Sequence, residues 1–90
     1  MDKYELQRRT KDFAHRCVRL AVSLQNDHLC NHVRNQLIRC STSVAANYRA
    51  ACLAKSKTDF ESKIGTVLEE SDESGFWLEF LLEEKVVTAK

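Results

Sequence analysis

Apolar or small residues recur at helical spacings, mostly three and four, in three separate stretches of this chain. The first seam is Leu6, Thr10, Phe13, Cys17, Leu20 and Leu24; the second is Leu29, Val33, Leu37, Val44, Tyr48 and Cys52; the third is Phe60, Ile64, Val67, Ser71, Ser74, Leu78 and Leu81. The 90 residues include no proline and only two glycines, so a many-stranded sheet would lack its turn residues. Long amphipathic helices are therefore the predicted secondary structure.

Two of the predicted helix starts carry a capping signal. Asp27 can cap the second helix, because its carboxylate can accept from an early N–H group. Ser56 is followed three residues later by Asp59, an arrangement in which the serine caps the helix and the carboxylate reaches back. We predict one all-α domain over residues 1–90, an antiparallel up-and-down bundle with helices at about 2–24, 28–54 and 57–85.

This arrangement is a four-helix bundle pattern from which we expect the fourth helix to be absent. The end of the third helix is apolar around nearly its whole circumference and needs a covering surface. We therefore predict an oligomer interface at Phe76, Trp77 and Phe80. Because glycine weakens a helix, Gly65 and Gly75 predict close backbone contacts.

Small residues fill the middle of the second helix and permit close approach of a neighbouring helix. They are Cys40, Ser41, Thr42, Ser43, Ala45, Ala46, Ala50 and Ala51. Close packing is the favoured interpretation, and ligand binding by the serines is the alternative.

The net charge of +1 conceals two halves of opposite sign. Residues 1–57 contain eleven Lys and Arg against four Asp and Glu, whereas residues 58–90 contain three against nine. We expect these halves to attract each other within the domain, with an anionic partner as the alternative.

The cations of the first helix form the best candidate for nucleic-acid binding. The candidates are Arg8, Arg9, Lys11, Arg16 and Arg19, with His15 among them and Arg34 from the second helix. Such cations could contact the phosphates of RNA or DNA. No aromatic residue interleaves them, so a solvated helix face is the competing interpretation.

Carboxylates of the third helix are predicted to form a polar network with the second helix. The proposed members are Arg39, Asn47, Arg49, Glu69, Glu70 and Glu73. No glutamate precedes a histidine by three residues, as a di-iron bundle requires, and His28 and His32 lack a nearby third ligand. We therefore predict no enzymatic activity, no catalytic or metal-binding residues, no cofactor and no small-molecule substrate.

The four cysteines include no C-x-x-C pair and are expected to be reduced core residues in a cytoplasmic protein. The chain does not begin with a secretory leader, and its apolar runs are too short for a membrane span.

A longer motif resembles a known family. Gln36, Arg39, Ser43, Ala46 and Asn47, followed by Ser56, Asp59 and Phe60, match the pattern Q-x-x-R-x-x-x-S-x-x-A-N…S-x-x-[DE]-F. This pattern is similar to that of the four-helix bundle proteins encoded in 23S rRNA intervening sequences. The chain departs from it at Ala50 and Ala51, where many members carry E-G, and in ending at Lys90, near the expected start of the family's fourth helix.

The resemblance implies a small cytoplasmic bacterial protein, generally of unassigned role, that forms a homopentameric ring in structurally similar members. A related branch, the accessory variability protein of diversity-generating retroelements, associates with a reverse transcriptase and nucleic acid. We therefore expect a homo-oligomeric interaction module, with a basic accessory protein binding RNA or DNA as the alternative.

Overall fold

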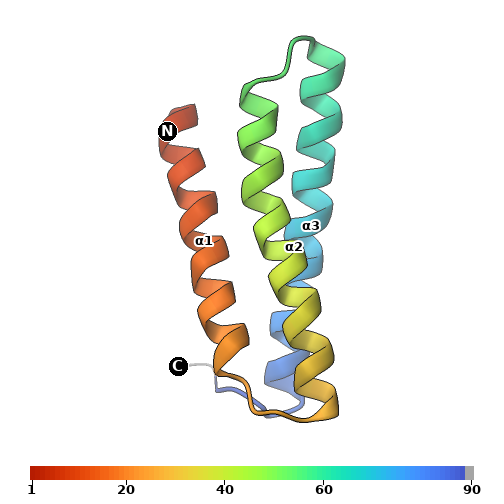
Figure 1. The fold of residues 1–90 in the computed structure, drawn as a ribbon. Helices are drawn as coiled ribbons and strands as arrows, with labels where there is room; N and C mark the ends of the chain where they lie inside the picture. Colours follow the sequence, from red (N-terminus) through yellow and green to blue (C-terminus); the bar gives the residue numbers. More distant parts are fainter. Residues whose placement is uncertain (89–90) are drawn as a thin grey trace.

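The computed structural model describes residues 1–88 as three long helices joined by short turns (Figure 1). Helix α1 spans Lys3–Ser23, α2 spans His28–Cys52 and α3 spans Lys57–Glu83. Successive helices run in opposite directions along a rod of 44 × 21 × 18 Å. The predicted all-α, antiparallel architecture is confirmed.

Helix α2 is the central helix of the three. Both α1 and α3 pack along it, whereas no Cα atom of α1 comes within 8 Å of a Cα atom of α3. Val33, Leu37 and Cys40 of α2 are fully buried, and Leu37 and Cys40 pack with Cys17 and Ala21 of α1. Because α1 and α3 approach α2 more closely than they approach each other, one side of each remains open.

Side-chain caps explain where the helices begin. Carboxylate oxygens of Asp2 and Asp27 and the hydroxyl of Ser56 each accept a hydrogen bond from the N–H group three residues later, at 2.8, 2.8 and 3.0 Å. The predicted starts at residues 28 and 57 are correct. The carboxylate of Asp59, however, does not reach back to Ser56, because it accepts a hydrogen bond from Lys63 at 2.5 Å.

Helix α3 ends at Glu83, two residues before its predicted end. Lys85 adopts a left-handed conformation with φ of 60°, its N–H group donates to the carbonyl of Leu82, and that of Val86 donates to the carbonyl of Leu81. This pair of hydrogen bonds is the Schellman motif that terminates many helices. It folds Val86 back against the buried Leu81.

The cysteines belong to the core of the bundle. Cys17, Cys30 and Cys40 are buried, as predicted, and Cys52 is half-buried. Burial raises the pKa of the Cys17 and Cys40 thiols, because removal from water disfavours the thiolate form. These thiols are therefore protonated and unreactive at neutral pH.

Candidate functional site

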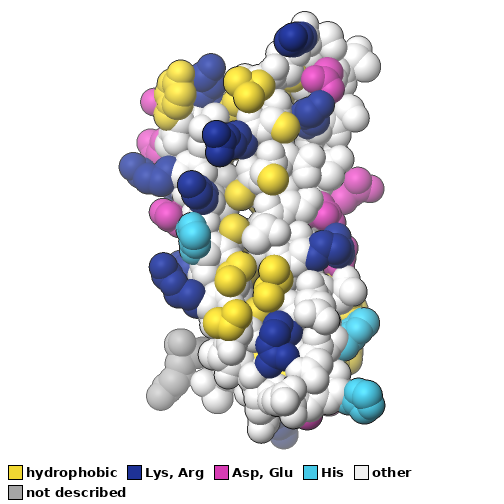
Figure 2. Space-filling model, viewed as in Figure 1, with side chains coloured by type: hydrophobic (Ala, Val, Ile, Leu, Met, Phe, Trp, Pro, Cys, Tyr) yellow, Lys and Arg dark blue, Asp and Glu magenta, His cyan; other side chains and the backbone are white. Residues whose placement is uncertain are grey.

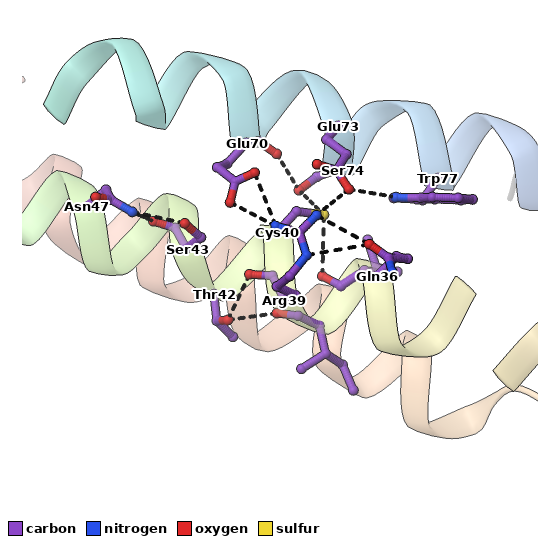
Figure 3. A network of polar contacts seen from close by, with 12 residues as sticks. Gln36, Arg39, Cys40, Thr42, Ser43, Asn47, Glu70, Glu73, Ser74 and Trp77 are labelled. Atoms are coloured by element: carbon purple, nitrogen blue, oxygen red, sulfur yellow. Dashed lines mark hydrogen bonds and ion pairs between the residues drawn. The ribbon is translucent and has the colours of Figure 1, made fainter. Parts of the chain in front are cut away.

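A cluster of polar side chains joins α2 to α3 around the guanidinium of Arg39 (Figure 3). Arg39 donates to Glu70 at 3.1 Å and to Glu73, and Gln36 accepts from the same guanidinium at 3.3 Å. The indole N–H of Trp77 donates to Glu73 at 3.1 Å. The hydrogen bonds from Arg39, followed by that from Trp77, lower the pKa of Glu73. Glu70 and Glu73 are thus occupied in holding the two helices together.

Other predicted members of this network lie elsewhere. The amide of Asn47 donates to the carbonyl and hydroxyl oxygens of Ser43 in its own helix, at 3.0 and 2.9 Å. Glu69 is exposed, and Arg49 lies on the side of α2 that faces α1. The prediction was wrong for Asn47, Glu69 and Arg49. For Arg49 the reason is geometric, because ten residues separate it from Arg39 and the two side chains lie about 80° apart around the helix axis.

Phe76, Trp77 and Phe80 form an aromatic ridge on α3. The ring centroids lie 4.9 Å apart for Phe76 and Trp77 and 6.2 Å apart for Trp77 and Phe80. The ring of His32 packs edge-to-face with Trp77, with their centroids 5.4 Å apart. Phe76 remains 52% exposed. The ridge therefore offers solvent-accessible aromatic surface at the predicted interface residues.

A groove runs between α1 and α3, on the side where these helices do not touch. Its two adjoining hollows, of about 310 and 810 Å³, share Arg9, Phe13 and Leu78. Gly75 also lines it, yet a Cβ atom at Gly75 or at Gly65 would have no packing neighbour within 4 Å. The close contacts predicted for both glycines are absent among the described residues, so neither glycine is explained by packing within them.

The predicted basic face of α1 is divided between two surfaces. Arg9 and Arg16 face the groove toward α3, where Asp12 accompanies them. Arg8 and Lys11 instead line a second groove, of about 720 Å³, between α1 and α2. Arg19 is exposed outside the lining of both grooves.

We call this second groove the basic groove, and Figure 2 shows the face of the molecule that contains it. Its cationic or titratable side chains are those of Arg8, Lys11, His15 and Arg49, and Tyr4 lies at one end. Small or apolar residues complete most of the lining, namely Ala14, Val18, Thr42, Ala45 and Ala46. The sequence analysis did not place Arg49 in this groove. Its spacing could have done so, because Arg49 lies seven residues, or about two helical turns, after Thr42 and therefore on the same side of α2.

Arg34 does not have the free guanidinium expected of a phosphate-binding residue. Its guanidinium donates to the carbonyls of Ala21, Leu24 and Gln25 at 3.0, 2.5 and 3.1 Å, and to the side chain of Asn31 at 2.5 Å. These carbonyls belong to the end of α1 and the turn after it, and helix-terminal carbonyls lack partners within the helix. Arg34 therefore fastens the turn between α1 and α2, and its inclusion in the nucleic-acid surface was wrong.

The expected attraction between the basic and acidic halves is confined to one arginine. Within residues 1–88, Glu70 and Glu73 pair with Arg39, while Asp59 pairs with Lys63 in its own helix. None of these ion pairs joins α1 to α3. The expectation fails for α1 because α2 lies between the two oppositely charged helices.

Two other kinds of feature are absent from residues 1–88. In residues 1–88, no three His, Cys, Asp or Glu side chains lie close enough together to hold a metal ion. No helix in the same range has the length and apolar character to cross a lipid bilayer.

The fold and its surfaces define an all-α helical bundle protein with open grooves on both sides of α1. No family model matches the chain, and no curated protein matches its sequence significantly. Its structure is similar to the crystal structure of a protein of unknown function from the S23 ribosomal protein family of Bacteroides thetaiotaomicron VPI-5482, with a TM-score of 0.82 and 32% sequence identity. The match covers 92% of this chain and 77% of that protein. The chain belongs to the S23 ribosomal protein family.

Proposed function

We propose that this chain is a non-catalytic interaction module that acts as a homo-oligomer. The observation that carries the proposal is the apolar surface of α3, on which Phe60, Leu68, Phe76 and Leu82 are 43%, 66%, 52% and 40% exposed. Phe76 also contacts the rings of Trp77 and Phe80, and exposed aromatic surface of this kind on a small domain is typical of an interaction site.

The placement of α3 supports the same proposal. Within the described residues α3 packs mainly on α2 and meets α1 only through side chains of the core, so a helix that is apolar on several sides is incompletely covered. The groove between α1 and α3 leaves Phe13, Leu20 and Leu78 only partly buried. A second protein surface would remove these side chains from water and contribute the free energy that a small core lacks.

The resemblance to proteins encoded in 23S rRNA intervening sequences suggests a pentameric ring. Analytical ultracentrifugation from micromolar to sub-millimolar protein tests for assembly. We expect a species several times heavier than one chain. A monomer at every concentration would refute the homo-oligomeric function.

A matched pair of substitutions tests which apolar surface matters. Leu68→Gln alters α3, whereas Leu53→Gln alters the turn after α2, and the two leucines are 66% and 75% exposed. We expect Leu68→Gln to weaken assembly and Leu53→Gln to leave it unchanged. Equal effects would contradict a specific interface on α3.

Binding of RNA or DNA is a second candidate, which the cations of the basic groove favour. Arg8, Lys11 and Arg49 could contact phosphates, and the family resemblance adds a branch that associates with nucleic acid and a reverse transcriptase. Filter binding at low and moderate salt tests this candidate. Salt-dependent retention that Arg8→Glu abolishes would support it, and no retention at micromolar protein would count against it.

A further inference from the structure

We infer that the basic groove between α1 and α2 receives helix α3 of a second copy of this chain. The inference rests on the proposed homo-oligomer and specifies its interface. The basic groove and helix α3 lie on different parts of each chain, so the contact is heterologous. Such a contact repeats from copy to copy and produces either a closed ring or a filament.

Charge complementarity is the first argument. No Asp or Glu appears among the described residues that line the basic groove. Helix α3 carries eight Asp and Glu against two Lys. Asp72 and Glu79 are exposed and form no ion pair with residues 1–88, so their counter-charge is not supplied within the described chain.

The outward face of α3 has a regular pattern, which is the second argument. Seven residues from Glu61 to Leu82 alternate at spacings of four and three, and none of them is a buried residue. We call this set the outer seam, and its members are Glu61, Gly65, Leu68, Asp72, Gly75, Glu79 and Leu82. These residues lie along one side of the helix, where Leu68 and Leu82 can make apolar contacts and Asp72 and Glu79 can pair with cations of another chain.

The α1 edge of the groove repeats the same arrangement. Tyr4, Arg8, Lys11, His15 and Val18 are also spaced by four, three, four and three. This set and the part of the outer seam from Leu68 to Leu82 both have apolar residues at their ends, with Asp72 and Glu79 between them on α3 and Arg8, Lys11 and His15 between them on α1. Each covers fifteen residues, and its ends lie about 21 Å apart along the helix axis, so the two have equal length.

The shape of the two surfaces is the third argument. The groove contains Ala14, Ala45 and Ala46, whose small side chains permit close approach of another helix. Gly65 and Gly75 of the outer seam have open space around the position of a Cβ atom. Glycine weakens a helix relative to alanine, and close contact with a second copy accounts for its presence at both positions.

Charge reversal provides the test. We expect Arg8→Glu with Lys11→Glu, and separately Asp72→Lys with Glu79→Lys, to weaken self-association at least about tenfold in sedimentation velocity. One chain that carries all four changes should restore assembly, because groove and α3 then match in charge at every contact. Circular dichroism verifies that each variant is folded.

The control reverses Arg19 and Lys55, which are exposed and line neither groove, and should leave association unchanged. If the unaltered chain assembles but both reversed variants assemble equally well, the interface is refuted and the homo-oligomeric function stands. A monomeric unaltered chain refutes both. If reversal of Arg8 and Lys11 abolishes RNA retention without changing self-association, the groove is a nucleic-acid site and the inference fails.

A glycine variant gives a second measurement. Gly65→Ala meets no neighbour within the described chain, so the melting temperature of dilute, dissociated protein should rise. The same substitution should weaken self-association at higher concentration, because a methyl group separates the two helices. Unchanged or stronger association would contradict close packing at this glycine.

Discussion

Replacing Leu37 by alanine tests whether α2 is the central helix of the bundle. Leu37 is fully buried and packs with Cys17 and Ala21 of α1, and with Trp77 and Leu78 of α3. The substitution removes three buried carbon atoms, which costs about 2.4 kcal/mol at about 0.8 kcal/mol each. A residual cavity raises the expected loss to about 3–4 kcal/mol.

This loss is large for a chain of 90 residues, whose unfolding free energy is expected to be about 5–13 kcal/mol. Urea denaturation followed by far-ultraviolet circular dichroism measures it, with protein concentration held constant because assembly would add to stability. Leu53→Ala is the matched control, since it removes the same atoms from a side chain that is 75% exposed. It should change stability by less than about 0.5 kcal/mol. A loss below about 1 kcal/mol for Leu37→Ala, or equal losses for both, would refute the central position of α2.

Individual contacts give four further tests by urea denaturation. Ser56→Ala removes the cap of α3 and should lower the unfolding free energy by about 1 kcal/mol; no change would contradict the capping role. Lys85→Gly relieves a left-handed conformation and should raise it by about 0.5–1 kcal/mol, whereas a decrease would contradict the left-handed assignment. Arg34→Met takes the guanidinium donor from the carbonyls of Ala21, Leu24 and Gln25, of which Ala21 and Gln25 keep a backbone donor, and should lower it by about 1–3 kcal/mol; no change would contradict the fastening role of Arg34. Because Arg39 lowers the pKa of Glu73 below its unfolded value, this pair stabilises the fold at neutral pH, and the contribution is lost as pH falls below the ordinary glutamate range and through the lowered pKa. Arg39→Met should therefore destabilise at neutral pH but progressively less as the solution is acidified through that pKa, and an equal effect at every pH would argue against the pairing.

The sequence was sufficient to predict the three helices and the residues that start them. Apolar spacing defines a helix locally, and Asp27 and Ser56 cap through hydrogen bonds to residues only three positions away. The ends were less accurate. Helix α3 was predicted two residues too long, because nothing in the local pattern signals the left-handed conformation of Lys85, where glycine is the usual residue.

The candidate sites were harder to predict because they depend on which helices touch. Arg39 was assigned correctly to Glu70 and Glu73, since α2 and α3 are consecutive and antiparallel. Arg49 was assigned to the same carboxylates, although its direction from the helix axis places it in the basic groove. The contacts of Arg34 with the turn after α1 depend on three-dimensional geometry that spacing along the helix does not encode.

The outer seam of α3 shows a different kind of omission. Its spacing of four and three is as regular as that of the buried seam, but it contains three carboxylates and two glycines among its seven residues, so a search for apolar periodicity does not detect it. Packing distinguishes the two seams. Ser74 and Leu81, which belong to the seam from Phe60 to Leu81, are fully buried, whereas Leu68 of the outer seam is 66% exposed.

The arrangement of the helices also explains why the charge asymmetry of this chain is directed outward. Opposite charges can neutralise each other within a domain only if their helices are in contact, and α2 separates the basic α1 from the acidic α3. Arg39 neutralises part of the α3 charge from one side, which leaves the carboxylates of the outer seam facing solvent. A chain with this helix order therefore presents an anionic helix and a cationic groove on the same molecule. Because the two surfaces have matching residue spacing, each copy carries both partners of the contact that we propose.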